Sequence, residues 1–156
     1  MDRTLNVSRA VWAGLIAGIV FMMVEMILVG TLGGGSPWGP PRMIAAMAMG
    51  KGVLPPPATF DITILMVAMM IHFVMSIIFA IVFAWVADRM AWSRTTTIVA
   101  GMIFGLILYV VNFYGMTAVF PWFAMARNWI SIFAHVMFGG VLGWYYAGGY
   151  AHRAAA

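Results

Sequence analysis

Long apolar runs separated by short polar segments dominate the pattern along the chain. Four runs cover residues 9–32, 61–86, 96–118 and 126–147 approximately. A hydrocarbon core about 30 Å thick requires roughly 20 apolar residues per helix, and each run meets that length. The runs are continuous, unlike the alternating segments of roughly ten residues in an outer-membrane barrel. The pattern therefore predicts an all-α membrane protein with four transmembrane helices.

The segment between the first two runs predicts a further short helix. The glycines at 33–35 end the first run, and Pro40 and Pro41 can begin a new helix. Residues 41–50 are too few to span a bilayer, so we expect an interfacial or re-entrant helix there. The other connections are short, which makes neighbouring runs antiparallel. We expect an up-down four-helix bundle within a single integral membrane domain, residues 1–156.

Composition agrees with this class and narrows the chemistry. The chain is 65% hydrophobic and 8% charged, which is too few charges for a soluble domain. It contains no cysteine, so disulfide and thiolate chemistry are excluded. The first run is too long for the core of a signal peptide, and we expect it to be a retained span.

The basic residues predict an orientation and not nucleic-acid binding, because in membrane proteins they mainly set topology. Five of the eight fall on the side of the chain termini: Arg3, Arg9, Arg89, Arg94 and Arg153. The opposite side has Arg42, Lys51 and Arg127. This bias predicts that both termini are cytoplasmic.

Small residues recur at intervals of four in every run, and they predict close helix packing in the cytoplasmic half. The sets are Ala10, Gly14 and Gly18; Ser76, Ala80 and Ala84; Gly101 and Gly105; and Gly139 and Gly143. Such glycine faces also allow a different role, in which the protein is a structural or accessory subunit, or a homo-oligomer, packed through them.

One conspicuous polar residue occurs in the outer half of each run: Glu25, His72, Asn112 and His135. At 1.5 Å per residue, Glu25 and Asn112 lie about 10 Å deep and the histidines about 14–17 Å deep. Ionisable side chains at such depth are costly and usually face the bundle interior. We therefore expect a polar pocket beneath the short helix.

Several chemistries fit these four residues. The histidines and Glu25 can bind or relay protons, whereas Asn112 can equally act as packing glue between helices. His72 and His135 can instead be purely structural, the axial ligands of haem b, or metal ligands together with Glu25. Clustered methionines allow a copper site, and Arg127 and Asn128 can reach toward the layer. No phosphate loop, nucleophile elbow or HExxH pair predicts an enzyme of a familiar class.

The second and fourth runs share a pattern that suggests an internal repeat. His72, Ser76 and Ala80 have the same spacing as His135, Gly139 and Gly143. Two related hairpins would be parallel repeats about an axis along the membrane normal. This interpretation predicts a pseudo-twofold arrangement with the two histidines face to face.

The segments "IHFVMSIIFAIVFAWVAD", "AGMIFGLILYVV" and "PWFAMARNWISIFAHVMFGG" occur in the order found in YagU-like bacterial inner-membrane proteins. The resemblance is best over residues 71–140, which include His72, Pro121, Trp122, Asn128 and His135. It implies a small inner-membrane protein linked to acid tolerance, with the two histidines as the family-like pair. The segment between the first two spans is shorter here than in the family, and Glu25 has no support from the match.

Together these observations favour a non-enzymatic inner-membrane protein whose outer-half pocket handles protons or a small solute. We expect His72 and His135 to bind or titrate, Glu25 to modulate them and Asn112 to orient one ring. We expect no cofactor, no nucleic acid and the lipid bilayer as the main partner. The alternatives are an accessory subunit and a haem b electron-transfer protein with two histidine ligands.

Overall fold

The computed structural model describes residues 4–150, and all of their regular structure is helical. The α-helices are α1 (Val7–Thr31), α2 (Gly39–Met49), α3 (Ile62–Arg89), α4 (Arg94–Val110) and α5 (Trp129–Ala147). The shorter elements are η1 (Lys51–Val53), the π-helical turn η2 (Val111–Gly115), η3 (Met116–Ala118) and η4 (Pro121–Ala126). α4, η2 and η3 form one continuous apolar span, Arg94–Ala118. Within the described residues, α1, α3, this span and α5 are long and apolar enough to cross a membrane.

Each long helix begins at a side chain that caps it. The side chains of Asn6, Asp61, Ser93 and Asn128 accept hydrogen bonds from the backbone N–H three residues later. Such caps satisfy amides that have no partner inside the helix. The cap at Asn128 starts α5 at Trp129, three residues after the expected start at 126. This reduces the expected depth of His135 by about 4.5 Å at 1.5 Å per residue.

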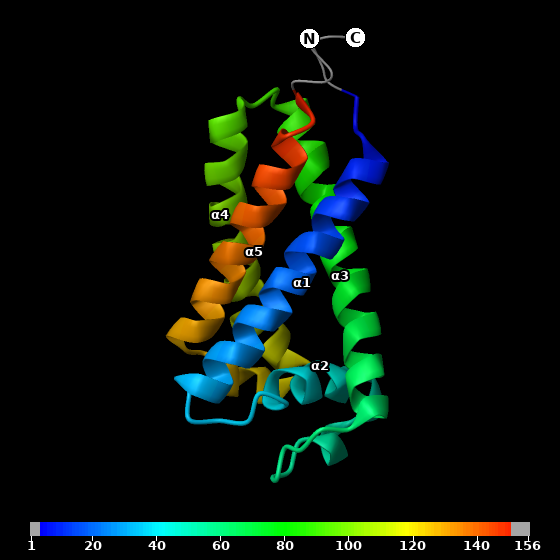
Figure 1. The fold of residues 1–156 in the computed structure, drawn as a ribbon, viewed down its shortest axis with the longest axis vertical. Coiled ribbons are helices and arrows are strands. Elements are labelled where there is room, and N and C mark those ends of the chain that lie inside the picture. Colours follow the sequence, from blue (N-terminus) through cyan, green and yellow to red (C-terminus); the bar gives the residue numbers. More distant parts are fainter. Residues whose placement is uncertain (1–3, 151–156) are drawn as a thin grey trace.

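Consecutive long helices run in opposite directions, and α2 lies across their lower ends in Figure 1. α1 packs against both α3 and α5, and α4 packs against α5. α3 and α4 have few contacts. Near the upper end, Phe83 of α3 packs against Phe104 of α4 and against Trp92 in the connection between these helices. The helices therefore converge at the upper end and separate toward the lower end.

This order does not have the predicted pseudo-twofold symmetry. A twofold axis relating the two hairpins would make the α1–α5 contact equivalent to the α4–α3 contact, yet the first is extensive and the second is small. The reason lies in α1, whose buried face is built from small residues, including Ala10, Ala13 and Ala17 at 0% exposure. Small side chains let α3 and α5 both approach α1 closely.

The small residues identified in the sequence pack within the chain, each set against its hairpin partner. A Cβ on Gly14 would lie 2.8 Å from the carbonyl oxygen of Ser76 and 2.9 Å from Cβ of Ala80. On the other hairpin, Gly101 and Gly139 face each other so closely that a Cβ on either would overlap the other's carbonyl. Gly105 lies against the His135 carbonyl and Gly143 against that of Thr97. These glycine faces are therefore covered inside the molecule.

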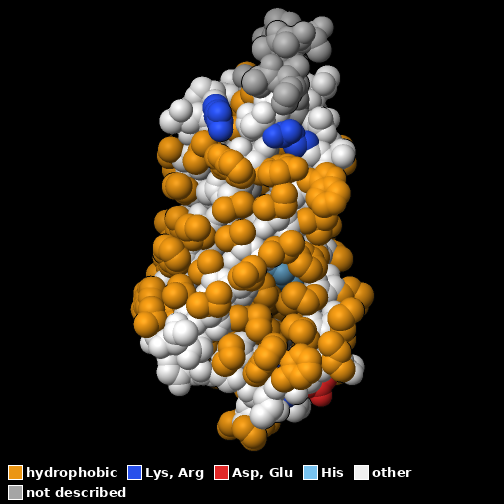
Figure 2. Space-filling view, viewed as in Figure 1, with side chains coloured by type: hydrophobic (Ala, Val, Ile, Leu, Met, Phe, Trp, Pro, Cys, Tyr) orange, Lys and Arg blue, Asp and Glu red, His pale blue; other side chains and the backbone are white. Residues whose placement is uncertain are grey.

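The outward faces of the helices are more apolar than the buried ones. On α3 the large exposed residues recur mainly at intervals of four: Ile62, Met66, Met70, Val74, Ile78, Val82 and Trp85. The buried face of the same helix contains alanines, His72, Ser76 and Asp88. Apolar side chains cover the middle of the molecule in Figure 2, and basic side chains gather at the upper end. This distribution is that of a multi-pass membrane protein.

The upper end is closed by polar contacts that the sequence did not predict. The Tyr146 hydroxyl donates to Oδ2 of the buried Asp88 and accepts from the backbone N–H of Asn6. The guanidinium of Arg9 donates to the carbonyls of Tyr145 and Tyr146, near the end of α5. These contacts join α1, α3 and α5 at this end.

The basic residues used for the topology prediction divide between the two ends. Arg9, Arg89 and Arg94 lie at the upper end, where α1 and α4 begin and α3 ends. Arg3 and Arg153 lie outside the described residues. The three basic residues predicted for the opposite side lie on α2, on η1 and two residues before α5.

Candidate functional site

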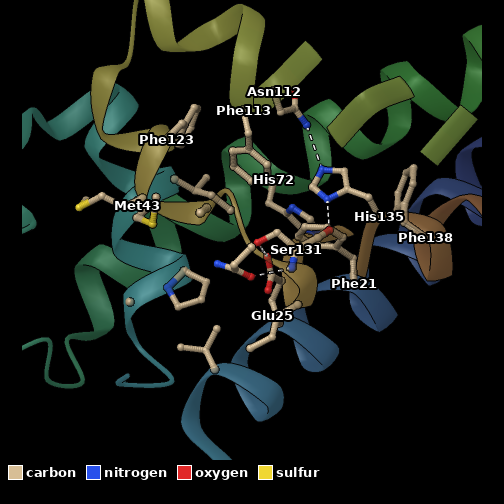
Figure 3. Close-up of a pocket in the computed structure, with 18 of the residues that line it drawn as sticks. Phe21, Glu25, Met43, His72, Asn112, Phe113, Phe123, Ser131, His135 and Phe138 are labelled. Carbon is tan, nitrogen blue, oxygen red and sulfur yellow. Dashed lines mark hydrogen bonds between the residues drawn. The ribbon is translucent and has the colours of Figure 1, made fainter. Parts of the chain in front are cut away.

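A cavity of about 530 Å³ occupies the lower half, where the helices separate. Its walls come from α1, α3, the α4–η2 region and α5, and α2 with η4 lines its lower end. Glu25, His72, Asn112 and His135 all line it, so the structure brings the four predicted residues to one site (Figure 3). Most of the remaining lining is aromatic or aliphatic, including five methionines.

Glu25 projects from α1 into this site and is only 4% exposed. Its Oε1 accepts a hydrogen bond of 2.7 Å from the hydroxyl of Ser131 on α5. Its Oε2 is buried and has no hydrogen-bond partner among the described residues. A buried polar atom without a partner costs about 1–3 kcal/mol, so this oxygen is an exception that requires an explanation.

Ser131 connects Glu25 to His135, a role that sequence reasoning missed. It lies in the first turn of α5 at 2% exposure, where Asn128 caps its backbone N–H. Its carbonyl accepts a hydrogen bond of 2.7 Å from Nδ1 of His135, one turn further along the helix. The available signal was a hydroxyl placed four residues before a histidine in an otherwise apolar run.

The hydrogen bonds of His135 define its tautomer. The Ser131 carbonyl can only accept, so Nδ1 carries the hydrogen, and Nε2 accepts from the Asn112 side-chain amide at 3.2 Å. Asn112 belongs to the π-helical turn η2, a type of turn that is frequent at functional sites. This contact joins α5 to the α4 span (Figure 3).

His72 is held by a backbone contact on the opposite side of the site. Its Nε2 donates to the carbonyl of Gly18 at 2.9 Å. A Cβ on Gly18 would lie 3.3 Å from this nitrogen and 2.9 Å from the Ser76 hydroxyl, so a glycine here lets the ring approach α1. The contact explains why Gly18, one of the small residues that recur at intervals of four, lies next to a histidine.

The structure does not bring the two histidine rings into contact, although the repeat interpretation predicted them face to face. Each ring instead packs against Phe21, with ring centroids 5.4 Å apart for His72 and 4.7 Å apart for His135. No ring contact joins the two histidines within the described part of the chain. The helix order accounts for this, because α1, which carries Phe21, lies between α3 and α5.

The present hydrogen bonds engage the nitrogens that a haem would need. Nε2 of His72 and both ring nitrogens of His135 are bonded within the chain. Iron ligation through Nε2 of both rings would require both to give up these contacts. No cluster of three His, Cys, Asp or Glu side chains suited to a metal occurs among the described residues. The haem and copper alternatives stay predictions, which an absorption spectrum and metal analysis can test.

The lower end of the α4 span is secured by Arg127, which does not line the cavity. Its guanidinium donates to the Phe113 carbonyl at 2.7 Å and to the Thr117 hydroxyl at 3.1 Å, and it lies over the Tyr114 ring.

Asn128, the other residue expected to reach the layer, does line the cavity. Among the described residues, Glu25 is the only carboxyl group in the lining, and no Lys or Arg contributes to it.

An aromatic cluster closes the site toward α2. Phe113 packs against Phe123 with ring centroids 5.8 Å apart. The indole N–H of Trp122 donates to the Met43 carbonyl at 2.9 Å, which ties η4 to α2. This hydrogen bond places α2 against the α4 side of the site, although α2 also packs against α3.

The chain matches no model of a known protein family, no curated protein and no solved structure. These comparisons do not test the resemblance to YagU-like proteins, which stays a prediction.

Proposed function

We propose that the protein is an up-down four-helix protein of the bacterial inner membrane with both termini in the cytoplasm. In this orientation the polar contacts of Asp88 and Tyr146 lie on the cytoplasmic side, and the cavity lies in the half of the membrane that faces outward. α2 then lies at the interface between the inner membrane and the external solution. Its first residues include Pro40 and Pro41. The five-to-three bias of basic residues in the sequence, which counts Arg3 and Arg153 with the chain termini, supports this orientation.

We propose further that the cavity binds a small solute. Its volume of about 530 Å³ falls in the range of roughly 300–1,000 Å³ typical of small-molecule sites. Its walls are mainly apolar with a few polar groups, which is also typical of such sites. The observation that carries the proposal is Glu25, a buried carboxyl group with an unpartnered oxygen at a cavity wall. Proton binding alone would not require this space.

The absence of cysteine allows a direct test, because any introduced thiol is the only one in the chain. Single cysteines replace Met75 and Met116, which line the cavity from α3 and η3, and Met70, which is 63% exposed on the outer face of α3. The reagent is a small methanethiosulfonate added to the outside of oriented vesicles. It reacts with thiolates, which form only where water reaches the sulfur.

We expect Met75→Cys and Met116→Cys to react and Met70→Cys, which faces lipid, to stay inert. If the cavity cysteines were as inert as Met70→Cys, water would not reach the cavity, and the proposed solute site would be wrong. If they reacted only from the inside, the site would stand and the proposed orientation would be wrong.

Proton handling is a second candidate, and the hydrogen bonds around Ser131 favour it. The Ser131 hydroxyl donates to Glu25, the Ser131 carbonyl accepts from His135, and Nε2 of His135 accepts from Asn112, so these contacts link three spans. This linkage, which passes through the backbone of Ser131, can couple protonation of the carboxyl group to the position of the ring. The acid tolerance implied by the YagU-like resemblance points the same way. Proton uptake by proteoliposomes that is abolished in Glu25→Gln would support it, and equal uptake by both proteins would contradict it.

A further inference from the structure

We propose that the solute is an organic cation, namely a protonated amine attached to an apolar body, and that its ammonium group binds Glu25. This inference rests on the proposed solute site and names its ligand class. It follows from three properties of the cavity: the charge of its lining, the free oxygen of Glu25 and the chemistry of the surrounding walls.

Among the described Asp, Glu, Lys and Arg residues, the cavity lining contains a single one, and it is acidic. Glu25 lines the cavity, whereas no Lys or Arg does so in the described part of the chain. Arg127, the basic residue adjacent in sequence to the lining residue Asn128, is engaged with Phe113 and Thr117. A carboxylate in an apolar site is stabilised by a partner of opposite charge, whereas an anionic solute would be repelled by it.

The free oxygen specifies a donor on the ligand. Ser131 already donates to Oε1 of Glu25, and Oε2 is left with no partner. An ammonium group carries N–H donors and a positive charge, so it satisfies this acceptor with a charge-assisted hydrogen bond. A quaternary ammonium group has the charge but no N–H, and it would leave the oxygen unsatisfied.

The remaining walls suit an apolar body that carries a cation. Aromatic rings of Phe21, Phe113, Phe123, Phe138 and Trp129 line the cavity. Aromatic faces attract cations within about 6 Å and also bury apolar surface. Thioethers of lining residues such as Met43 and Met75 add polarizable surface that adapts to ligand shape. A strongly hydrated inorganic cation would find few oxygen ligands here.

The test compares three probes with one body and different charges: 3-phenylpropylammonium, 3-phenylpropanol and 3-phenylpropanoate. Each is titrated by equilibrium dialysis against the full chain in lipid nanodiscs, with empty nanodiscs correcting for partition into lipid. Wild type is compared with Glu25→Gln, whose amide oxygen still accepts from Ser131 and whose volume is nearly unchanged. A thermal unfolding curve of each variant confirms that it is folded.

The matched control is Asp61→Asn, which removes one negative charge at the same end of the molecule but outside the cavity. Asp61 is exposed and caps α3 through its side chain, and Asn caps a helix equally well. This variant distinguishes a specific contact with Glu25 from general attraction of cations to an acidic surface.

We expect wild type to bind the ammonium probe about 10- to 100-fold more tightly than the alcohol, the range expected for a charge-assisted hydrogen bond. Glu25→Gln should lose this preference while its affinity for the alcohol is unchanged, and Asp61→Asn should retain it. The proposed cation is wrong if ammonium and alcohol bind equally to wild type, if Glu25→Gln keeps the preference, or if Asp61→Asn loses it. Binding of none of the three probes would instead contradict the solute site itself.

Discussion

Two adjacent glycines of α5 have opposite surroundings, and they provide a sharp test of the packing between α4 and α5. A Cβ on Gly139 would overlap the Gly101 carbonyl and lie 2.7 Å from its carbon and 2.9 Å from the backbone nitrogen of Gly105. A Cβ on Gly140 would meet only side-chain atoms of Met102, at 3.4 Å. The first contact involves backbone that cannot rotate away, and the second involves a flexible side chain.

These distances allow the free energies to be estimated. Replacing glycine by alanine inside a helix gains up to about 1 kcal/mol in intrinsic propensity. Overpacking costs about 1–3 kcal/mol, and Gly139→Ala should reach the upper limit because α4 as a whole must shift. The expected net effect is a loss of about 2 kcal/mol for Gly139→Ala and a gain of up to 1 kcal/mol for Gly140→Ala. The two variants should therefore differ by about 3 kcal/mol, although the substitution is chemically identical.

Unfolding by dodecyl sulfate in mixed micelles, followed by circular dichroism, measures this difference. Gly140→Ala serves as the matched control for the propensity gain and for the loss of one glycine. Equal stabilities of the two variants, or a more stable Gly139→Ala, would refute the close approach of α4 and α5. A change confined to Gly139→Ala would support it.

Two further substitutions test hydrogen bonds around the cavity. Ser131→Ala should lower the free energy of unfolding by about 1–3 kcal/mol, because neither oxygen of Glu25 then has a partner in the ligand-free protein. Adding Glu25→Met should restore part of this loss, and an unchanged unfolding curve for Ser131→Ala alone would argue against the contact. Trp122→Phe removes the donor to the Met43 carbonyl and should cost about 1 kcal/mol. Amide hydrogen exchange should then increase in α2, and unchanged exchange would show that this bond does not hold the helix.

The helices and their outward surfaces could be predicted from the sequence because they depend on local properties. The length of each apolar run follows from bilayer thickness, and the four long helices lie close to the expected boundaries. The start of α5 was misplaced by three residues because Pro121 begins a separate 3₁₀ helix, η4, and Asn128 provides a later cap. The π-helical turn at Asn112 had no local signal in the apolar pattern.

The depth of the polar residues was also accessible from the sequence, since position along a helix converts directly into height. Depth explains why Glu25, His72, Asn112 and His135 reach one cavity. It does not specify their partners, because a hydrogen bond depends on the rotation and separation of two helices.

The sequence by itself determined that this chain forms four membrane-length helices with small-residue seams and one layer of polar side chains. The spacing of small and polar residues along each run, together with bilayer thickness, is sufficient to predict those features. Only the tertiary structure decided that Ser131 pairs with Glu25 across 106 positions of sequence and that Gly18 accepts from His72. It also decided that α1 lies between α3 and α5, which places Phe21 against both histidines. Local periodicity carries no information on this helix order, which depends on how closely the buried faces can approach one another.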